Sequence, residues 1–360
     1  MDRRAAGGLE AARRTRTALA DEQIRPADLA RGAAGYDRLR VRIGSNPAKA
    51  QRAACTPPER VTLVTVAWIP HLKGYFRSAL DIFRFSLLSA RENTDVAFDV
   101  LVVDNDSCKE VDRFLRAEQR AGNIQYVIRC DRNVGTVNAT VQALRAAPGE
   151  LIAFADYDVL FRERWLEELM SVQTAFPEAG IVCGVPIRNS PDAQLAVARD
   201  VFGSDGRTVV EEGSFVAGAV LEEWAASIGM SLEEYLNHPN VRNTDLRLTR
   251  GGATAYAGGG HFAYLTTADA VGRSAHPRTD KLVPKRCPGY DVQITNLGIP
   301  TLSTARPVFY HLGNCLAEEW VQTEYTRLVG RRAPRAATQP AGEARGTFPR
   351  VARAAAIVRR

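Results

Sequence analysis

The stretch Leu151-Ile-Ala-Phe-Ala-Asp-Tyr-Asp158 places two carboxylates directly after a short apolar run. An apolar run of this length predicts a buried strand over 151–154. Because Asp156 and Asp158 are one residue apart where the chain turns, both can face one site. Hard divalent cations such as Mg²⁺ and Mn²⁺ prefer such oxygen ligands. The alternative is that the two acids provide an N-cap and a turn for the helix that follows.

Similar strand-like runs occur on both sides of this stretch and alternate with helical patterns. This alternation predicts an α/β fold with a mostly parallel sheet, covered by helices on both faces. In such sheets ligands bind at the carboxyl ends of the strands, where the polar residues of this chain are found. The further predicted strands are 61–66, 98–103, 124–128 and 179–184, and the predicted helices are 76–87, 109–121, 137–146 and 165–170.

Composition narrows the class of protein. The chain has 360 residues and a net charge of +6, and much of that excess comes from arginines near its two ends, which argues against nucleic acid as a partner. Its six cysteines form no C-x-x-C pair, so they fit neither a zinc site nor a disulfide framework. No apolar run approaches the roughly 20 residues of a transmembrane segment. We therefore expect a soluble, cytoplasmic protein with reduced thiols.

Five motifs between Val61 and Leu169 occur in a recognisable order, each at or near a predicted strand. They are Val61-Thr-Leu-Val-Thr-Val66, Val102-Val-Asp-Asn-Asp-Ser107, Arg132-Asn-Val-Gly135, Pro148-Gly-Glu-Leu-Ile152 and Asp156-Tyr-Asp158. Together they resemble the nucleotide-binding half of the family 2 glycosyltransferases. The resemblance implies a GT-A fold, which is Rossmann-like with a less regular C-terminal half. It also implies an enzyme that uses a nucleotide-diphosphate sugar and Mn²⁺ or Mg²⁺.

By this resemblance, the residues at the strand ends bind the sugar donor. Asp158 would hold the metal, and the donor-binding residues would be Ala67, Trp68, Asp104, Asn133, Gly135 and Asp156. Some of these positions have simpler interpretations. Asp104 can close its strand in an Asx turn, and Trp68 can pack in the core.

Two motifs in the second half complete the predicted site. Gly289-Tyr-Asp-Val-Gln293 corresponds to the family's glutamate-aspartate pair, so Asp291 would be the general base that deprotonates the acceptor hydroxyl. The alternative is that Asp291 is an N-cap. Tyr310-His-Leu-Gly313 resembles the late histidine of many GT-A enzymes, which makes His311 a candidate metal ligand. The alternative is a capping or buried, hydrogen-bonded histidine.

Gly258-Gly-Gly-His-Phe-Ala263 fits the dinucleotide fingerprint G-x-G-x-x-A by residue type. The sequence indicates neither a strand leading into it nor a helix opening from it, so we do not expect a dinucleotide site. We expect instead a shelf beneath the acceptor, formed by Gly259, Gly260 and His261. The basic residues Lys281, Lys285 and Arg286 form either a lid over the diphosphate or a solvated loop.

These motifs define four segments of the chain. We expect a flexible basic segment over 1–58, a nucleotide-sugar-binding half over 59–185, an acceptor and catalytic half over 186–329, and a flexible basic tail over 330–360. The favoured donor is a UDP-sugar, with a GDP-sugar as the second option, and the acceptor carries a free hydroxyl.

Other functions stay open. Thr136-Val-Asn-Ala-Thr140 lacks the arginine that the family usually has after its asparagine-glycine loop. A retaining GT-A transferase shares the nucleotide half, and so does a nucleotide-sugar-binding protein without catalysis. A sugar-nucleotide pyrophosphorylase-like nucleotidyltransferase would need a glycine-rich basic loop after the first strand. The chain has Ala67-Trp-Ile-Pro70 there.

Overall fold

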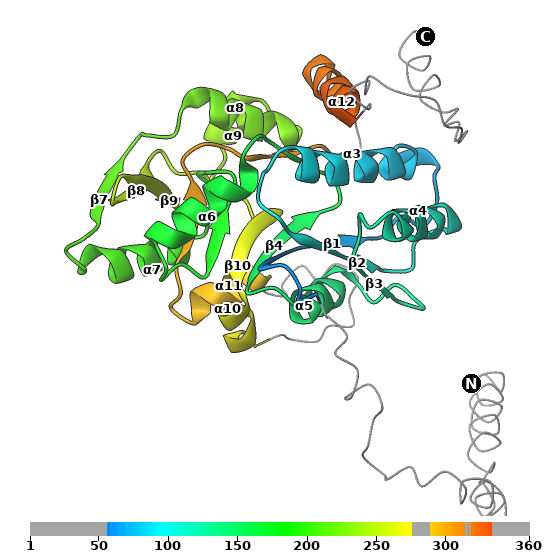
Figure 1. Cartoon of the computed structure of the whole chain (residues 1–360). Helices are drawn as coiled ribbons and strands as arrows, with labels where there is room; N and C mark the ends of the chain where they lie inside the picture. The colour runs from blue at the N-terminus through cyan, green and yellow to red at the C-terminus, as the bar shows by residue number, and fades with distance from the viewer. Residues whose placement is uncertain (1–55, 276–288, 314–315, 317, 333–360) are drawn as a thin grey trace, which may run out of the picture. The chain divides into compact units, whose positions relative to one another are not determined.

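The computed structural model describes residues 56–275, 289–313, 316 and 318–332 (Figure 1). The chain divides into the units Met1–Pro57 and Pro58–Arg360, and every element described below belongs to the second. The segments expected to be flexible lie outside the described residues except at 56–58 and 330–332, and Lys281, Lys285 and Arg286 lie outside them entirely. Within the described part, no helix has both the length and the apolar character needed to cross a membrane.

A ten-stranded sheet with the order β3-β2-β1-β4-β10-β6-β11-β9-β8-β7 forms the centre of the second unit (Figure 1). Its first four strands are parallel, and β1, β2 and β4 are almost entirely buried, as their continuous apolar runs predict. These four strands are β3 Tyr126–Arg129, β2 Asp99–Asp104, β1 Val61–Ala67 and β4 Leu151–Asp156.

The other end of the sheet is mixed. Strand β10 runs antiparallel to both of its neighbours, β4 and β6, whereas β6 and β11 are parallel. The last strands are antiparallel to one another. A separate two-stranded ribbon joins β5 and β12. These strands are β10 Ala263–Thr267, β6 Ile181–Cys183, β11 Thr301–Thr304, β9 Ala253–Ala257, β8 Asp245–Arg250, β7 Val209–Gly213, β5 Val159–Phe161 and β12 Phe309–His311.

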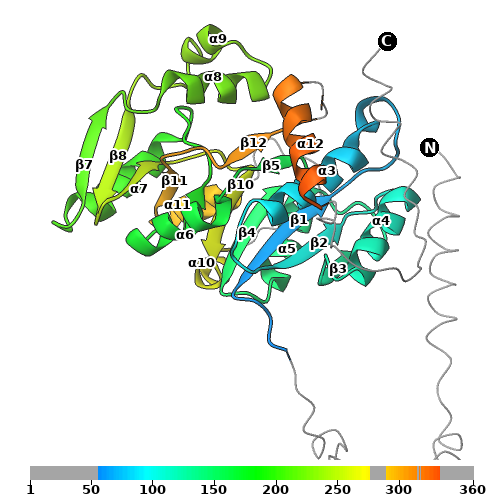
Figure 2. The ribbon, with the colours of Figure 1, turned by 45° about the horizontal axis from the view of Figure 1, so that its top comes forward.

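Helices cover both faces of the sheet, as predicted (Figure 2). One core contains Phe83 of α3, Leu115 of α4 and Trp165 of α6, and the other contains Leu144 of α5 and Ile294 of α11. The helices are α3 Ala79–Glu92, α4 Lys109–Arg120, α5 Thr136–Ala146, α6 Trp165–Ala175, α7 Asp192–Gly203, α8 Gly218–Ser227, α9 Leu232–Leu236, α10 Ala268–Arg273, α11 Tyr290–Asn296 and α12 Glu319–Arg332, with a 3₁₀ turn, η2, at Gly74–Phe76.

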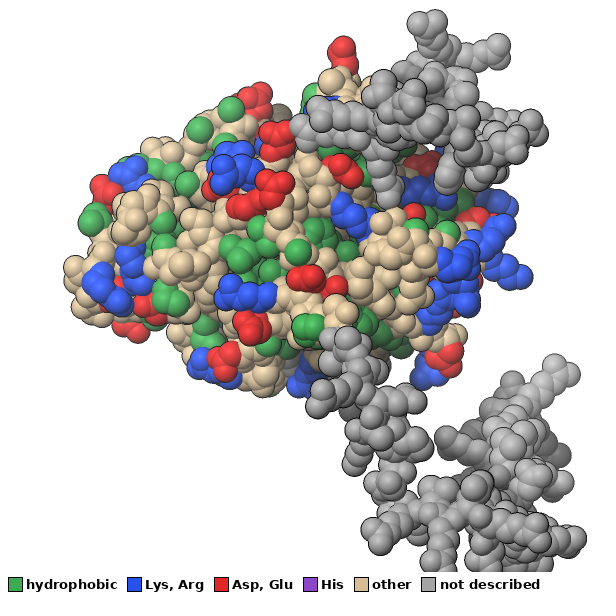
Figure 3. Space-filling view, viewed as in Figure 1, with side chains coloured by type: hydrophobic (Ala, Val, Ile, Leu, Met, Phe, Trp, Pro, Cys, Tyr) green, Lys and Arg blue, Asp and Glu red, His purple; other side chains and the backbone are tan. Residues whose placement is uncertain are grey.

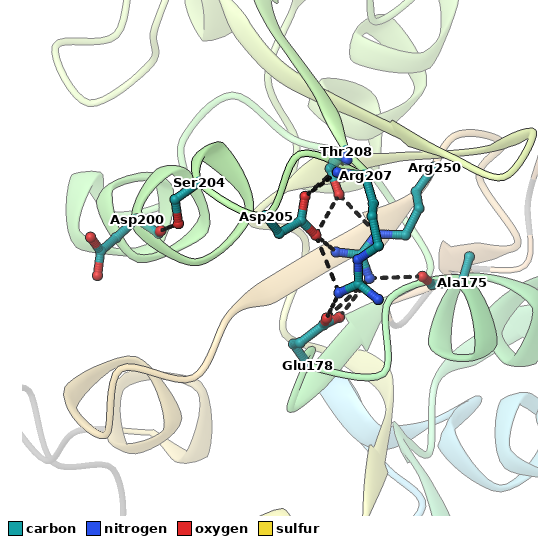
Figure 4. Close-up of polar contacts among 8 residues, drawn as sticks. All are labelled: Ala175, Glu178, Asp200, Ser204, Asp205, Arg207, Thr208 and Arg250. Carbon is teal, nitrogen blue, oxygen red and sulfur yellow. Dashed lines mark hydrogen bonds and ion pairs between the residues drawn. The ribbon is translucent and has the colours of Figure 1, made fainter.

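Arg250 links the antiparallel end of the sheet to the segments beside it through ion pairs (Figure 4). Arg250, at the end of β8, reaches Glu178 with 2.8 Å between Nη1 and Oε2, and it also pairs with Asp205. Its guanidinium lies 5.2 Å from the ring centroids of both Phe176 and Phe202. Because Glu178 precedes β6 and Asp205 follows α7, one side chain connects the end of β8 to two loops.

Basic side chains gather over α4 and β3, at the right of the view in Figure 3. Several already have acidic partners on the same helix: Arg113 lies 2.9 Å from Glu110, and Arg116 lies 2.9 Å from Asp112. Arg129 of β3 also pairs with Asp112. The patch is therefore partly neutralised by its own carboxylates.

Candidate active site

The carboxyl ends of three neighbouring strands bring the first predicted site residues together. In the register of the sheet, Ala67 of β1 pairs with Asp104 of β2, and Val66 pairs with Asp156 of β4. Strand β4 runs on to Asp156, two residues beyond the predicted end. Ala67, Asp104 and Asp156 therefore lie at one edge of the sheet.

Asp104 has the local role that its Asx-turn interpretation describes. The side chain is buried, and its Oδ1 accepts a 2.9 Å hydrogen bond from the backbone N–H of Ser107. The Ser107 hydroxyl then donates to the carbonyl of Ala67 over 3.2 Å. This turn fixes the end of β2 against the end of β1.

Trp68 does not pack in the core, so that interpretation is wrong. Its side chain is 39% exposed directly after β1, and its ring meets Phe76 edge to face with 5.6 Å between centroids. An indole exposed beside the strand ends is available to a planar ligand.

Asn105 organises the neighbouring loop and is not among the residues predicted from the sequence. It is buried between β2 and the loop, where its Nδ2 donates to Asn133 Oδ1 over 3.0 Å and its Oδ1 accepts from Val134 N–H over 2.9 Å. Gly135, with a φ of 82°, caps α5 and donates its N–H to Asn133 Oδ1 over 2.8 Å. The signal that could have found Asn105 is an amide placed directly after a buried strand.

Asp156 and Asp158 lie on either side of a tight turn between β4 and β5. The N-cap interpretation is wrong for both, because Arg164 caps α6 and β5 lies in between. The ribbon of β5 and β12 pairs Val159 with His311. This pairing brings His311 Nε2 to 3.4 Å from Asp158 Oδ2.

The hydrogen bonds of His311 define what can occupy the space in front of it. Its Nδ1 lies 3.4 Å from the backbone carbonyl of Ser227 in α8. A carbonyl oxygen only accepts, so we assign the hydrogen to Nδ1. The lone pair of Nε2 then faces the Asp158 carboxylate, and only a proton or a cation satisfies two acceptors that face each other. The hydrogen bond with Asp158 raises the pKa of His311. In protonated His311, the proton on Nε2 lies between the two acceptors.

Burial and the negative charge of Asp158 together raise the pKa of Asp156 to about 7, although His311 opposes the rise. A divalent cation would relieve the repulsion between the two carboxylates. Among the described residues, no three or more His, Cys, Asp or Glu side chains cluster as a metal site. A cation held by Asp158 and His311 would therefore need further ligands from a bound molecule.

The glycine run lies beside the aspartates. Strand β9 leads directly into Gly258, so the expectation that no strand precedes the run is wrong. Strand β10, not a helix, follows it, so a dinucleotide site stays excluded. The backbone N–H of Asp156 donates to the carbonyl of Phe262 over 2.9 Å.

The run fits closely against its surroundings. Gly259 donates its N–H to Ser190 Oγ over 3.0 Å, and Gly260 donates to the carbonyl of Val185 over 3.0 Å. A Cβ added to Gly259 would lie 2.4 Å from Cys183 Cβ. Both glycines are buried, whereas His261 is exposed.

Trp224 of α8 also lies at this site, and nothing in the sequence pattern indicated it. Its ring stacks on Phe262 at 5.7 Å between centroids and 11° between planes. Phe262 in turn contacts the His311 ring at 5.6 Å. Helix α8 thus supports His311 through these rings and through the Ser227 carbonyl.

Asp291 lies in the first turn of α11. The N-cap interpretation is wrong, since Gly289 is the N-cap and no side chain caps this helix. Asp291 Oδ2 accepts from Gln194 Nε2 over 3.4 Å. Burial raises the pKa of Tyr264, and the charges of Asp291 and Asp156 contribute to that rise, so both carboxylates act on the same side chain.

Comparison with known proteins gives three results. Residues 75–223 match the family model described as Glycosyl transferase family 2. No curated protein sequence matches the chain. Among solved structures, the chain is similar to Staphylococcus aureus TarS 1–349 in complex with UDP at 12% identity, covering 78% of this chain and 67% of that one, with a TM-score of 0.38. It is also similar to the Pyrobaculum calidifontis mannosyltransferase PcManGT in complex with GDP-mannose and Mn²⁺, at 15% identity, 82% and 71% coverage, and a TM-score of 0.39.

Proposed function

We propose that the chain, whose residues 75–223 match the glycosyl transferase family 2 model, transfers a sugar from a nucleotide-diphosphate donor to an acceptor hydroxyl with inversion at the anomeric carbon. The favoured donor is a UDP-sugar, and a GDP-sugar is the second option. The family match argues against the pyrophosphorylase-like alternative. So does the segment after β1, where Trp68 takes the place of a glycine-rich loop.

The donor would lie along the carboxyl ends of β1, β2 and β4. Asp104 and Asp156 would accept hydrogen bonds from the base and ribose, and the exposed ring of Trp68 would lie beside the base. The loop of Asn133 and Gly135 would border the nucleotide from the other side. The observation that supports this placement is that these residues share one edge of the sheet.

The observation that carries the proposal is the pairing of Asp158 with His311. The residues fit a divalent metal, because a carboxylate and an imidazole lone pair face each other across 3.4 Å with the tautomer set by Ser227. Carboxylate oxygen suits Mg²⁺ and Mn²⁺, and the imidazole suits Mn²⁺ better. When bound, the ion supplies positive charge that stabilises the departing diphosphate.

The reaction needs one base and one leaving group. Asp291 would take the proton of the acceptor hydroxyl while that oxygen attacks the anomeric carbon. The bond between this carbon and the diphosphate oxygen breaks, and the diphosphate leaves with the electron pair. Gly259, Gly260 and His261 would lie on the acceptor side. This assignment is supported by Gly259, which lies against Cys183, and by the adjacent Phe262, whose carbonyl accepts a hydrogen bond from the Asp156 N–H.

We also place the reaction in the cytoplasm. Among the described residues, Cys108, Cys130 and Cys183 are unpaired thiols, as is usual in a reducing compartment.

A thermal-shift screen tests the donor and metal together. UDP-sugars and GDP-sugars are added with Mn²⁺ or with EDTA, and we expect one class to raise the melting temperature only with Mn²⁺. The hit is then offered to hydroxyl acceptors, and the anomeric configuration of the product is determined. No stabilisation by any nucleotide sugar in Mn²⁺ would refute the proposal, and a retained configuration would refute its inverting mechanism.

A further inference from the structure

Gln194 of α7 contacts the Asp291 carboxylate. It is 2% exposed, and its Nε2 donates to Asp291 Oδ2 over 3.4 Å. Asp291 belongs to α11, so the contact joins two helices that are far apart in the sequence. It is long for a hydrogen bond, as catalytic contacts often are before substrate binds.

The amide orientation is set by the carboxylate. An ionised carboxylate only accepts hydrogen bonds, so the NH₂ group must face Asp291 and the carbonyl must face away. Gln194 Oε1 is buried and has no hydrogen-bond partner within the described part of the chain. It faces Gly258, where an added Cβ would lie 3.2 Å from it. A buried acceptor without a partner is unfavourable, so a glutamine at this position is not the choice that stability alone would favour.

We propose that Gln194 is a positioning residue, which holds the Asp291 carboxylate toward the acceptor hydroxyl. This inference rests on the proposed role of Asp291 as the base. The Nε2 donor engages Oδ2 and restrains the rotation of the carboxylate, so that the carboxylate keeps one orientation while the acceptor binds. Gln194 acts on the reaction only through Asp291.

A double-mutant cycle on the full chain tests this dependence. Gln194→Met keeps the length and apolar volume of the side chain but removes the donor. We expect it to lower kcat for sugar transfer by about 10- to 100-fold, the scale of misplaced catalytic groups. In the Asp291→Asn background the same substitution should lower kcat no further. Donor affinity, measured by calorimetry with Mn²⁺, should stay unchanged. Gln194→Leu replaces Gln194→Met if that protein does not fold.

Gln173 of α6 provides a matched control. It is also a buried glutamine with an unpartnered Oε1, but its Nε2 donates to the carbonyl of Ala179 over 3.0 Å. Gln173→Met should change kcat equally little in both backgrounds. Equal losses from Gln194→Met in the presence and absence of the Asp291 carboxylate would overturn the inference and leave the base intact. Full activity of Asp291→Asn alone would overturn the base, and the inference with it.

Discussion

Single side chains at the candidate site differ in the partners that the protein already gives them. Asp104 closes a turn and Asn105 bridges a loop, so both are held before any ligand binds. Asp158 and His311 instead face each other as two acceptors, 3.4 Å apart. The first pair shapes the site, and the second is where a cation would be bound.

The shifted pKa of Asp156 predicts how pH and metal act together. Its pKa rises from 3.8 to about 7 in the folded protein, so the folded state binds this proton more tightly than the unfolded chain does. Its contribution to stability is therefore present at low pH and is lost as the pH rises through about 7. The metal-free protein should melt at a lower temperature at pH 8 than at pH 5.5.

Added Mn²⁺ should reverse that trend, because a cation held by Asp158 and His311 would stabilise the ionised form of Asp156. We expect the increase in melting temperature caused by Mn²⁺ to be larger at pH 8 than at pH 5.5, where a proton on His311 also competes with the metal. Asp156→Asn should flatten the pH dependence of the metal-free protein. Equal Mn²⁺ effects at both pH values would argue against a shared cation site.

Residues at strand ends could be predicted from sequence because a strand and the polar break after it are adjacent in the chain. Asp104 and Asp156 were found in this way. Trp224 and Gln194 were not, because their partners Phe262 and Asp291 are distant in sequence and no periodicity links them. Trp68 was left undecided because an aromatic residue after a strand fits both core and surface.

At the scale of elements, the shortest strands have the largest effect on the site. Strand β5 has three residues, Val159–Phe161, and its pairing with β12 is what brings His311 to Asp158. A three-residue apolar run gives too little pattern for a prediction. The longer runs of β1, β2 and β4 were predicted nearly to the residue, since strands buried on both faces require continuous apolar sequence.

Arg250 should contribute strongly to stability, because it connects separate elements of the fold. Its side chain is 11% exposed and pairs with Asp205 and Glu178, so Arg250→Met leaves these two carboxylates with Arg207, which is 67% exposed, as their remaining cation. Losing this partly buried cation should lower the free energy of unfolding by more than the loss of an exposed pair does. Denaturant unfolding measures the loss, and donor affinity of the folded fraction should be unaffected.

Arg84→Met is the matched control. Arg84 also pairs with an aspartate, Asp81, at 3.0 Å, but its side chain is 48% exposed. Exposed pairs contribute at most about 1 kcal/mol. If the two substitutions lower the free energy of unfolding equally, Arg250 does not stabilise the loops that it contacts.

At the scale of the whole second unit, the two predicted halves share one sheet. Strand β10, from the acceptor half, lies between β4 and β6 of the nucleotide half. The α/β class followed from the alternation of patterns, which is local. The strand order could not be predicted in this way, because the apolar sequence of β10 does not indicate which strands it pairs with. The boundary at 185 and 186 stays a prediction.

The shared edge predicts that donor and metal bind as a unit. Asp158 and His311 would supply only two ligands, so the diphosphate and the cation should each need the other. Calorimetry with UDP and with GDP measures the nucleotide affinity in Mn²⁺ and in EDTA. We expect the affinity in EDTA to be at least about tenfold weaker. Nucleotide binding of the same strength in EDTA would exclude a metal bridge.

The most direct test of the account compares Asp291→Asn with Asp158→Asn, and measures both sugar transfer and donor affinity for each. Asp291 should act only on the acceptor proton, so Asp291→Asn should lower transfer by about 10²-fold or more and leave donor affinity in Mn²⁺ unchanged. Asp158→Asn should weaken metal and donor binding as well as transfer. The account is contradicted if Asp291→Asn keeps full transfer, or if it loses donor affinity as severely as Asp158→Asn does.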